Sequence, residues 1–241
     1  MTHFESVLSL NTTEQGSFKI QGQIEAARLH IQHPIINEAV EIVSQLDGFI
    51  DRRKLIEIWS TDYSIGAKIV VTNWWGGISH FNRPRFYSDE NMKTLNSLSS
   101  DVLKGLNDDN PEELISRFLP RGDLYLQGIG VSFFTKYFQF STQASNSVPF
   151  IIADKWTLIA VMADAISQKV KVPWLFVNTR NRTVSFSTVD ASSYLEFNAY
   201  FVNRAKKLEV SPFFLEEKVF GWRGSRNQQL NPRRMGKDMI F

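Results

Sequence analysis

Apolar residues recur every three or four positions along much of the chain, a spacing typical of amphipathic helices. Asp47 and Gly48 interrupt the first clear pattern, as turn residues do at the end of a helix. In that pattern, over residues 35–46, one face is formed by Ile36, Ala39, Val40, Val43 and Leu46. The same spacing predicts further helices over residues 55–59, 89–106, 111–118 and 155–168.

The last third of the chain has a different pattern. Residues 174–177 and 183–187 are short apolar runs separated by a polar stretch, which predicts a two-stranded β-hairpin. Residues 1–34 are only weakly patterned. Further helices are expected over residues 24–31, from Asp190 or Ser192 to Leu208, and from Pro212 to about Trp222. The pattern therefore predicts a mainly α fold with a small β-hairpin near residues 174–187.

The segment LQGIGVSFFTKYFQF, residues 126–140, predicts a helix, a tight glycine turn and a second helix. Gly128 and Gly130 flank a single residue, so the chain can reverse where side chains would clash. The second helix is expected to begin at Val131, and its first amides have no partner within the helix. Those N–H groups and the helix dipole form a site for a phosphate. The pattern predicts a helix-hairpin-helix, with its first helix near residues 123–126, which grips a DNA backbone without reading bases.

Asp154 follows an apolar strip, residues 148–153, and precedes the helical stretch at 155–168. An aspartate in this place is a natural helix N-cap. It could equally hold a carboxylate over DNA that the hairpin has bound. The residues alone leave both roles open.

Two segments, QGIG at residues 127–130 and PFIIAD at residues 149–154, carry a resemblance to a known family. The chain resembles the helix-hairpin-helix DNA glycosylases of the 8-oxoguanine glycosylase and endonuclease III superfamily. In that family an LPGxG-like hairpin is followed by a VPVD-like segment with the catalytic aspartate. The resemblance covers about residues 51–168, which would form the core of one glycosylase unit over residues 1–241. Residues 169–241 would be a C-terminal helical extension with a basic tail.

The resemblance implies a DNA glycosylase that flips a damaged or modified base out of the duplex and hydrolyses its N-glycosidic bond, leaving an abasic site. Departure of the base builds positive charge on the sugar, and a carboxylate nearby stabilises that state. Asp154 would be this catalytic carboxylate. As a plain helix cap, the same residue would carry no chemistry.

The resemblance also implies simple hydrolysis without strand cleavage. Some relatives that cut the strand place a Schiff-base lysine two residues after the second hairpin glycine, where this chain has Ser132. Others place it just upstream of the hairpin, where no lysine stands between Leu106 and Gly130. Lys136 lies one helical turn beyond Ser132, on roughly the same face. It could act as a phosphate contact or be a solvated side chain.

The family resemblance assigns phosphate contacts to the hairpin and the start of the following helix. No metal site is expected from the sequence, and the only cofactor the resemblance suggests is a monovalent cation at the hairpin. The apolar segment 63–75 could by itself be a buried helix or a strand, and the family places a helix there. The expected DNA contacts are Gln127, Gly128, Gly130, Ser132 and Lys136.

Basic and aromatic residues interleave in a loop marked by glycine and proline, residues 76–87. Such a loop suits wedging into a duplex or stacking on an extruded base. Asn82 and Arg83 are the expected wedge residues, although a surface loop with packed aromatics would have the same composition. The candidate aromatics of the base pocket are Trp74, Trp75 and Trp156, for which core packing is the alternative.

Composition narrows the class of protein. The chain has 241 residues, 43% of them apolar, with nineteen Phe and six Trp, so it is globular and able to bury a core. Cysteine is absent, which excludes disulfides and the four-Cys cluster of some relatives. The four histidines form no metal-site motif. No apolar run is long enough for a membrane span, and residues 1–10 show no export signal, so a cytoplasmic monomer is expected.

The net charge of +2 is too small to indicate nucleic-acid binding by itself. Residues 221–241 carry five basic residues and a single acidic one. A solvated tail is the default interpretation of this segment, and a phosphate clamp is the functional alternative.

Two other classes of function stay open. The chain could be a DNA-binding module without enzymatic activity, or a subunit of a repair or defence complex. Some bacterial proteins with this glycosylase fold resemble phage-defence factors that attack modified bases. The loose match to the motifs of housekeeping repair enzymes favours such a role, with double-stranded DNA, including phage DNA, as the partner. The sequence does not identify the base.

Overall fold

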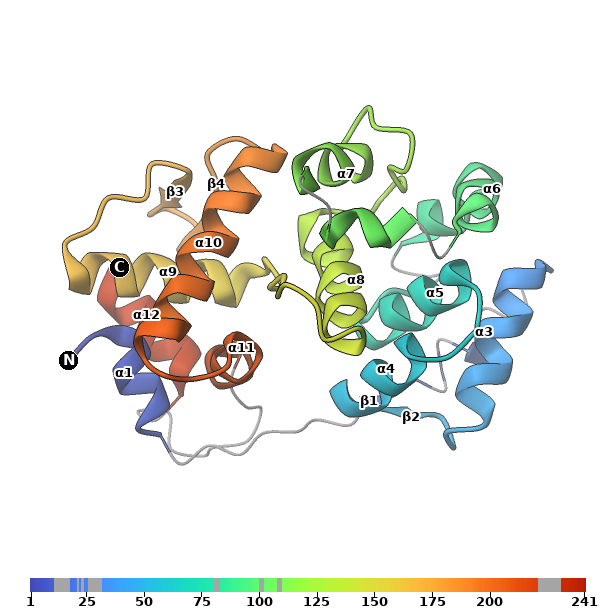
Figure 1. Ribbon diagram of the computed structural model, residues 1–241, viewed down its shortest axis with the longest axis horizontal. Coiled ribbons are helices and arrows are strands. Elements are labelled where there is room, and N and C mark those ends of the chain that lie inside the picture. Colours follow the sequence, from blue (N-terminus) through green and yellow to red (C-terminus); the bar gives the residue numbers. More distant parts are fainter. Residues whose placement is uncertain are drawn as a thin grey trace. The chain divides into compact units, whose positions relative to one another are not determined.

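The computed structural model describes residues 1–10, 18–20, 22, 24–25, 32–79, 83–99, 102–107, 110–220 and 231–241. The chain forms two compact units. One unit joins residues 1–16 to residues 149–241, and the other is residues 17–148. Helices make up most of both units (Figure 1), which confirms the predicted mainly α fold. The prediction that the whole chain acts as one glycosylase unit stays a prediction.

The unit of residues 17–148 is built from short helices and one two-stranded antiparallel sheet, in which Phe18 pairs with Ile50. Its elements are β1 (Phe18–Lys19), α3 (Pro34–Ser44), β2 (Phe49–Ile50), α4 (Arg52–Trp59), α5 (Ile65–Trp75), η1 (Pro84–Tyr87), α6 (Asp89–Ser97), η2 (Val102–Asn107), α7 (Pro111–Phe118) and α8 (Val131–Ala144). The helix expected over residues 63–75 is confirmed as α5. The helix expected over residues 24–31 falls mostly outside the described residues.

Every residue of α5 is buried, including polar ones, so their hydrogen bonds must be made inside the unit. Lys68 Nζ donates to the carbonyl oxygens of Trp59 and Thr61, and so caps the end of α4. Asn73 Oδ1 accepts from the hydroxyl of Tyr137 on α8 at 2.7 Å. These bonds tie α5 to α4 and α8, and α5 therefore forms the centre of this unit.

The unit of residues 1–16 and 149–241 surrounds α9. Its elements are α1 (His3–Leu8), α9 (Lys155–Gln168), β3 (Leu175–Asn178), β4 (Thr183–Phe186), α10 (Ala191–Lys207), α11 (Pro212–Phe220) and α12 (Pro232–Ile240). Helix α9 contacts α1, α10, α11, α12 and β4. The N-terminal α1 packs beside α11 and α12 (Figure 1), although these elements lie at opposite ends of the sequence. The hairpin of β3 and β4 is confirmed where the sequence predicted it.

A buried carboxylate joins three of these helices. Asp164 on α9 is fully buried and accepts from Arg204 Nε at 2.7 Å and from the Tyr200 hydroxyl at 2.9 Å, both on α10. It also accepts from the backbone N–H of Phe4 on α1 at 3.2 Å. Because a buried charge is costly unless it is paired, this set of bonds fixes the three helices in one arrangement.

The single helix predicted over residues 89–106 is wrong. Helix α6 ends at Ser97, and Leu98 has an extended backbone with ψ 116°. The serine-rich stretch after Leu95 favours this break, because serine side chains compete for backbone hydrogen bonds. Ser97 Oγ already donates to the carbonyl of Thr94 at 2.8 Å.

The helix predicted near residues 123–126, before the glycine turn, is also wrong. The chain folds back there over the end of α7, with the N–H of Leu124 bonded to the carbonyl of Arg117 at 2.9 Å. Gly122 permits this approach, because a Cβ at that position would lie 2.2 Å from the same carbonyl oxygen. The helix that precedes the hairpin is α7.

The default interpretation of residues 221–241 as a solvated tail is wrong for residues 232–240, which form α12. Asn231 caps this helix, and Pro232 occupies its first turn, where the missing N–H costs nothing. Gly236 lets α12 lie against α9, since a Cβ there would be 3.0 Å from Ile159 Cγ2. Helix α1 was not predicted, although Thr2 and Glu5 form a capping box around its start.

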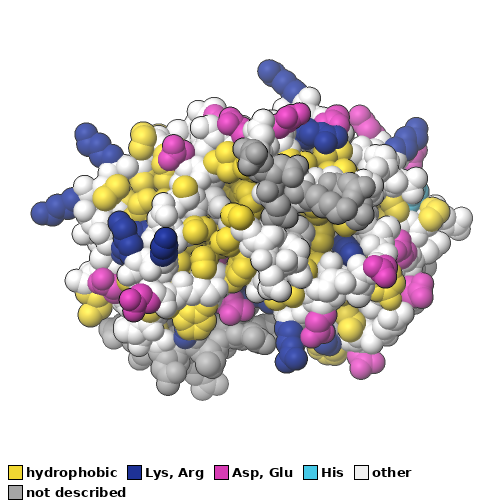
Figure 2. Space-filling model, viewed as in Figure 1, with side chains coloured by type: hydrophobic (Ala, Val, Ile, Leu, Met, Phe, Trp, Pro, Cys, Tyr) yellow, Lys and Arg dark blue, Asp and Glu magenta, His cyan; other side chains and the backbone are white. Residues whose placement is uncertain are grey.

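Positive charge is unevenly divided between the two units. Residues 1–16 and 149–241 carry 14 Lys and Arg against 10 Asp and Glu, whereas residues 17–148 carry 13 against 15. On the face shown in Figure 2, Lys and Arg side chains occur singly or in pairs among hydrophobic and acidic side chains. Phosphate binding on this face would therefore depend on small local groups of cations.

His3 makes the stability of its unit sensitive to acid. The side chain is 1% exposed, and neither ring nitrogen has a hydrogen-bond partner among the described residues. Burial lowers the pKa of His3 to about 4, against a smaller opposing effect of Asp164. The unfolded chain, with a histidine pKa of about 6.5, binds the proton more readily. Stability is therefore fully present above about pH 6.5 and falls as the pH is lowered towards 4.

We expect the free energy of unfolding to fall by about 2–3 kcal/mol between pH 7.5 and 4.5 through this histidine. Urea unfolding of the wild-type protein and of His3→Leu at both pH values measures the effect. The variant should lose that part of the pH dependence. An identical pH dependence in the two proteins would contradict the assignment.

Candidate functional site

The glycine turn has the backbone geometry that a hairpin requires. Gly128 has φ +80°, a conformation that side chains rarely adopt. The N–H of Ile129 bonds to the carbonyl of Leu126 at 3.0 Å and closes the turn. Gly130 is the N-cap residue of α8, and its lack of a side chain leaves the helix without a side-chain cap. Among the described residues, no atom lies within 4 Å of a Cβ built on Gly130, so space is open beside the first turn of α8.

Asn91, on α6, clamps this turn from the side. Its amide nitrogen donates to the carbonyl of Gln127 at 3.0 Å and to the carbonyls of Arg85 and Phe86 at 3.1 Å each. Its Oδ1 accepts from the N–H of Gln127 at 2.8 Å. Sequence reasoning missed Asn91, and the side-chain bond from Gln127 to Glu90 at 2.6 Å was missed with it. The clamp joins the hairpin to the segment that follows the predicted wedge residues.

Lys136 and Ser132 lie one helical turn apart on α8, as their spacing predicted. Lys136 Nζ donates to the carbonyl of Ser132 and lies 4.6 Å from the centre of the Phe133 ring. The side chain is only 6% exposed, so the alternative of a solvated lysine is wrong. Ser132 is half-buried.

The predicted wedge loop is described only in part. Asn82 lies outside the described residues. Arg83 is exposed and stands just before η1, with its N–H bonded to the carbonyl of Ser79 at 3.0 Å. Its segment adjoins the hairpin, because a Cβ on Gly128 would be 3.4 Å from Arg85 Cβ.

Trp74 and Trp75 pack inside the unit of residues 17–148. Trp74 is fully buried and donates from Nε1 to the hydroxyl of Tyr87 at 2.8 Å. Trp75 is 7% exposed and meets the Phe140 ring edge to face, with ring centres 5.5 Å apart. Both rings have the packing of core residues, and their role in a base pocket stays a prediction.

Asp154 is the N-cap of α9. Its Oδ1 accepts from the N–H groups of Trp156 and Thr157 at 2.8 and 3.0 Å, and Thr157 Oγ1 returns a bond to the N–H of Asp154. Its Oδ2 makes no hydrogen bond to any residue that the structure describes. One carboxylate oxygen is therefore fixed by the helix, and the other can face a substrate or a water molecule.

Two residues of α10 hold the strip that leads to Asp154. Asn198 accepts from the N–H of Ile151 at 2.9 Å and donates to the carbonyl of Pro149 at 3.0 Å. The hydroxyl of Tyr194 donates to the carbonyl of Ile151 at 2.9 Å. These supports escaped sequence analysis, because they lie more than 40 positions from the strip that they hold.

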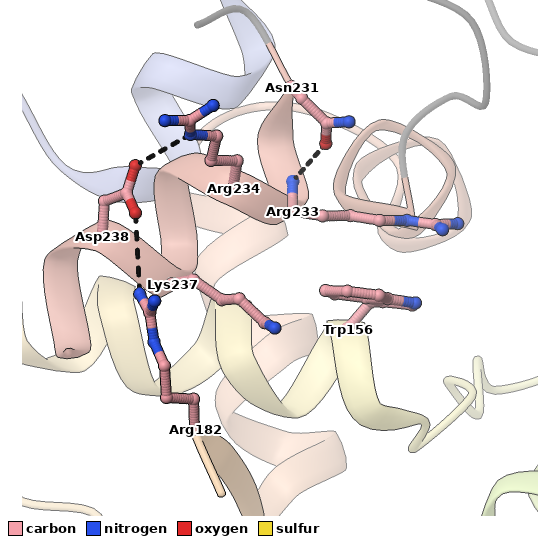
Figure 3. A pocket seen from close by; sticks show the side chains of 7 residues that line it. All are labelled: Trp156, Arg182, Asn231, Arg233, Arg234, Lys237 and Asp238. Atoms are coloured by element: carbon pink, nitrogen blue, oxygen red, sulfur yellow. Dashed lines mark hydrogen bonds and ion pairs between the residues drawn. The ribbon is translucent and has the colours of Figure 1, made fainter. Parts of the chain in front are cut away.

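Trp156 stands in the first turn of α9, two residues after Asp154, and lines a cavity of about 450 Å³. Its ring centre lies 4.9 Å from the guanidinium of Arg233 and 5.4 Å from Lys237 Nζ. Figure 3 shows the Arg233 guanidinium spread over one face of the ring. A cation therefore covers that face of the ring, and the role of Trp156 in a base pocket stays a prediction.

The hairpin belongs to the unit of residues 17–148, and Asp154 belongs to the other unit. Each half of the candidate site is thus described within its own unit. Among the described residues, no group of three or more His, Cys, Asp or Glu side chains could hold a metal ion. The same residues include no helix both long and apolar enough to cross a membrane.

Comparison with known proteins identifies the family. A family model described as "Putative 8-oxoguanine DNA glycosylase OGG-like protein" matches residues 14–220, a span that includes the hairpin and Asp154. The comparisons with curated proteins and with solved structures gave no match. The family implies DNA glycosylase activity in base excision repair, with DNA as the substrate. The mainly helical chain, with its glycine hairpin and its aspartate at the start of α9, therefore belongs to the 8-oxoguanine DNA glycosylase OGG-like family.

Proposed function

We propose that this chain hydrolyses the N-glycosidic bond of a damaged or modified base in double-stranded DNA and leaves an intact strand with an abasic site. The observation that carries the proposal is the division of labour between the two carboxylate oxygens of Asp154. Two backbone N–H groups of α9 donate to Oδ1. Oδ2 accepts no hydrogen bond from any residue that the structure describes, so it is available to the substrate. A carboxylate held in this way is oriented before the substrate arrives.

Asp154 would act on the sugar as the base departs. When the N-glycosidic bond breaks, its electron pair leaves with the base, so positive charge builds on the sugar ring. A preorganised carboxylate stabilises that charge, and its outer oxygen can orient or deprotonate the attacking water. Water then adds to the sugar, and the departing base takes up a proton.

The hairpin would hold the DNA strand by one phosphate. The first N–H groups of α8 and its dipole favour an anion, and the open space at Gly130 lets a phosphate approach. Gln127, Gly128 and Ser132 flank this space in sequence, and Lys136 adds positive charge one turn further on. Arg83 would wedge into the duplex from the neighbouring loop, as would Asn82.

A monovalent cation at the hairpin is compatible with the turn. Such an ion needs backbone oxygens, and the carbonyl of Leu126 accepts one hydrogen bond, from the N–H of Ile129, and keeps a second lone pair. The carbonyl of Gly130 already accepts from the N–H groups of Phe133 and Phe134. When bound, the ion would supply positive charge for the phosphate. The Leu126 carbonyl would be one of its ligands.

Two observations support hydrolysis alone. No lysine stands at position 132, and the Lys136 ammonium is bonded to the Ser132 carbonyl beneath the Phe133 ring. An ammonium held in this way is a poor nucleophile towards a sugar. We further propose that the substrates include modified bases of phage DNA, because the hairpin and aspartate segments depart from the LPGxG and VPVD forms of housekeeping repair enzymes.

Replacing Asp154 with asparagine should separate capping from catalysis. Asparagine caps a helix about as well as aspartate, so thermal stability should change little. Excision should slow by about 10²–10³, because the charge that faces the sugar cation is lost. The measurement is single-turnover excision, with alkali used to reveal abasic sites, on duplexes with unmodified, oxidised, alkylated or phage-modified bases.

Asp190→Asn is the matched control. Asp190 caps α10 through a bond from the N–H of Ser193 at 2.7 Å, so its replacement makes the same chemical change at another helix start of the unit. Its excision rate should equal that of the wild type. Normal excision by Asp154→Asn would reduce that residue to a helix cap, whereas no excision by the wild-type protein would leave the chain a DNA-binding module.

Bulk at Gly130 should weaken DNA binding by the same factor for every sequence, because a phosphate contact reads no bases. Gly130→Leu fills the open space, whereas Gly130→Ala has the same effect on capping but little bulk. We expect a larger dissociation constant for the leucine variant than for the alanine variant in fluorescence titrations. Equal affinities for the two variants, or a loss confined to one sequence, would count against the hairpin contact.

The product strand should remain uncut until alkali or heat is applied. Borohydride reduction during turnover should trap no covalent complex between protein and DNA, because no Schiff base forms. A trapped complex that disappears in Lys136→Gln would show that the enzyme is a lyase with Lys136 as the nucleophile.

A further inference from the structure

A pocket with excess positive charge lies in the unit that carries Asp154. Its walls come from the first turn of α9, the turn between β3 and β4, and α12 (Figure 3). The cavity of about 450 Å³ is lined by Trp156, Arg182, Asn231, Arg233, Arg234, Lys237 and Asp238. Four cationic side chains thus face one carboxylate.

The carboxylate does not balance these cations. Asp238 lies 3.8 Å from Arg182 and 3.5 Å from Arg234, and all three side chains are more than half exposed. Exposed ion pairs of this kind are weak. Burial, and then the nearby charges of Lys155 and Arg182, lower the pKa of Lys237. An anion in the pocket would relieve the repulsion among these cations.

Aromatic rings hold two of the cations in place. The Arg233 guanidinium lies 4.9 Å from the centre of the Trp156 ring and 4.5 Å from that of Phe220, and its Nε donates to the Phe220 carbonyl. Lys237 Nζ lies 5.4 Å from the Trp156 ring centre. Cation–π contacts of this kind order long side chains before a ligand arrives. Trp156 therefore serves to position cations in this pocket.

The chemistry of the cations indicates a phosphate group. Guanidinium groups are planar forks that match phosphate oxygens, and Lys237 adds a point charge. A stacked base is disfavoured, since Arg233 covers the face of Trp156 in Figure 3. The pocket also begins only two residues along α9 from Asp154, a rise of about 3 Å along the helix.

We propose that this pocket binds a backbone phosphate of the DNA strand whose base is excised, close to the sugar that faces Asp154. The inference rests on the proposed function, since it assumes that Asp154 faces that sugar. The contact places the strand without reading its sequence. It is separate from the hairpin, which belongs to the other unit.

The test is the salt dependence of DNA binding. We would compare the double variant Arg182→Gln with Arg233→Gln against the control double variant Arg180→Gln with Lys207→Gln. Both pairs remove two positive charges from the same unit, and Arg180 and Lys207 are exposed and do not line the pocket. The probe is an unmodified duplex, titrated between 50 and 200 mM salt by fluorescence anisotropy.

We expect the slope of log K against log salt, which is negative, to become less steep by about 0.9 in the pocket variant. This change is the effect of one lost phosphate contact. The control variant should keep the wild-type slope. The single variant Arg182→Gln keeps the test valid if the double variant misfolds, because Arg182 is an exposed turn residue that can change without loss of core packing. It should weaken binding by the same factor for every sequence, and Arg180→Gln should not.

Equal slopes for the pocket and control variants would overturn the proposal. Thermal unfolding with inorganic phosphate distinguishes the source of the anion. If phosphate raises the wild-type melting temperature but not that of the pocket variant, while the DNA slopes stay equal, the pocket holds a free phosphate and the DNA assignment is wrong. If the slope falls as expected but the wild-type protein excises no base, the pocket assignment stands and the proposed glycosylase activity fails.

Discussion

The burial of Asp164 is the constraint on which one half of the site depends. This carboxylate is paired with Arg204, whose side chain is 12% exposed, and it also binds α1 through a backbone N–H. Removing one partner of such a buried pair typically costs about 3–5 kcal/mol, because the other charge is left uncompensated. Helix α9 is thereby held in register with α1 and α10. Its first turn, with Asp154 and Trp156, can therefore be a fixed platform.

The two halves of the site are supported in the same way, by an asparagine that bonds to a distant stretch of backbone. Asn198 holds the strip before Asp154, and Asn91 holds the hairpin at Gln127. In both places the groups proposed to act on DNA, a carboxylate oxygen in one and backbone N–H groups in the other, carry little specificity for a base. Such supports keep loop residues in place while the chemistry stays at the surface.

How far sequence could predict this structure depended on whether the signal was local. Helix α9 and the β3–β4 hairpin follow from apolar runs and turn residues within each segment, and both are confirmed. Helix α5 was expected from the family resemblance, because its apolar run also fits a strand, and it too is confirmed. Asp154 and the glycine turn were found through short motifs. Asn91 could not be found, because its role depends on a partner 36 positions away. Helix α12 was missed because its basic sequence resembles a solvated tail. The close approach of Gly236 to α9 becomes visible only in the folded chain.

The unit that carries Asp154 is discontinuous in sequence, and this has a consequence for how the protein is made. Residues 17–148 leave the ribosome as a complete unit and can fold first, since domains generally fold as units from the N-terminus during synthesis. Helix α1 must wait, because its partner Asp164 lies 160 positions after Phe4. Contacts so distant in sequence form slowly. The unit that carries Asp154 is therefore completed last, and a nascent chain can fold its hairpin before Asp154 is fixed at the start of α9.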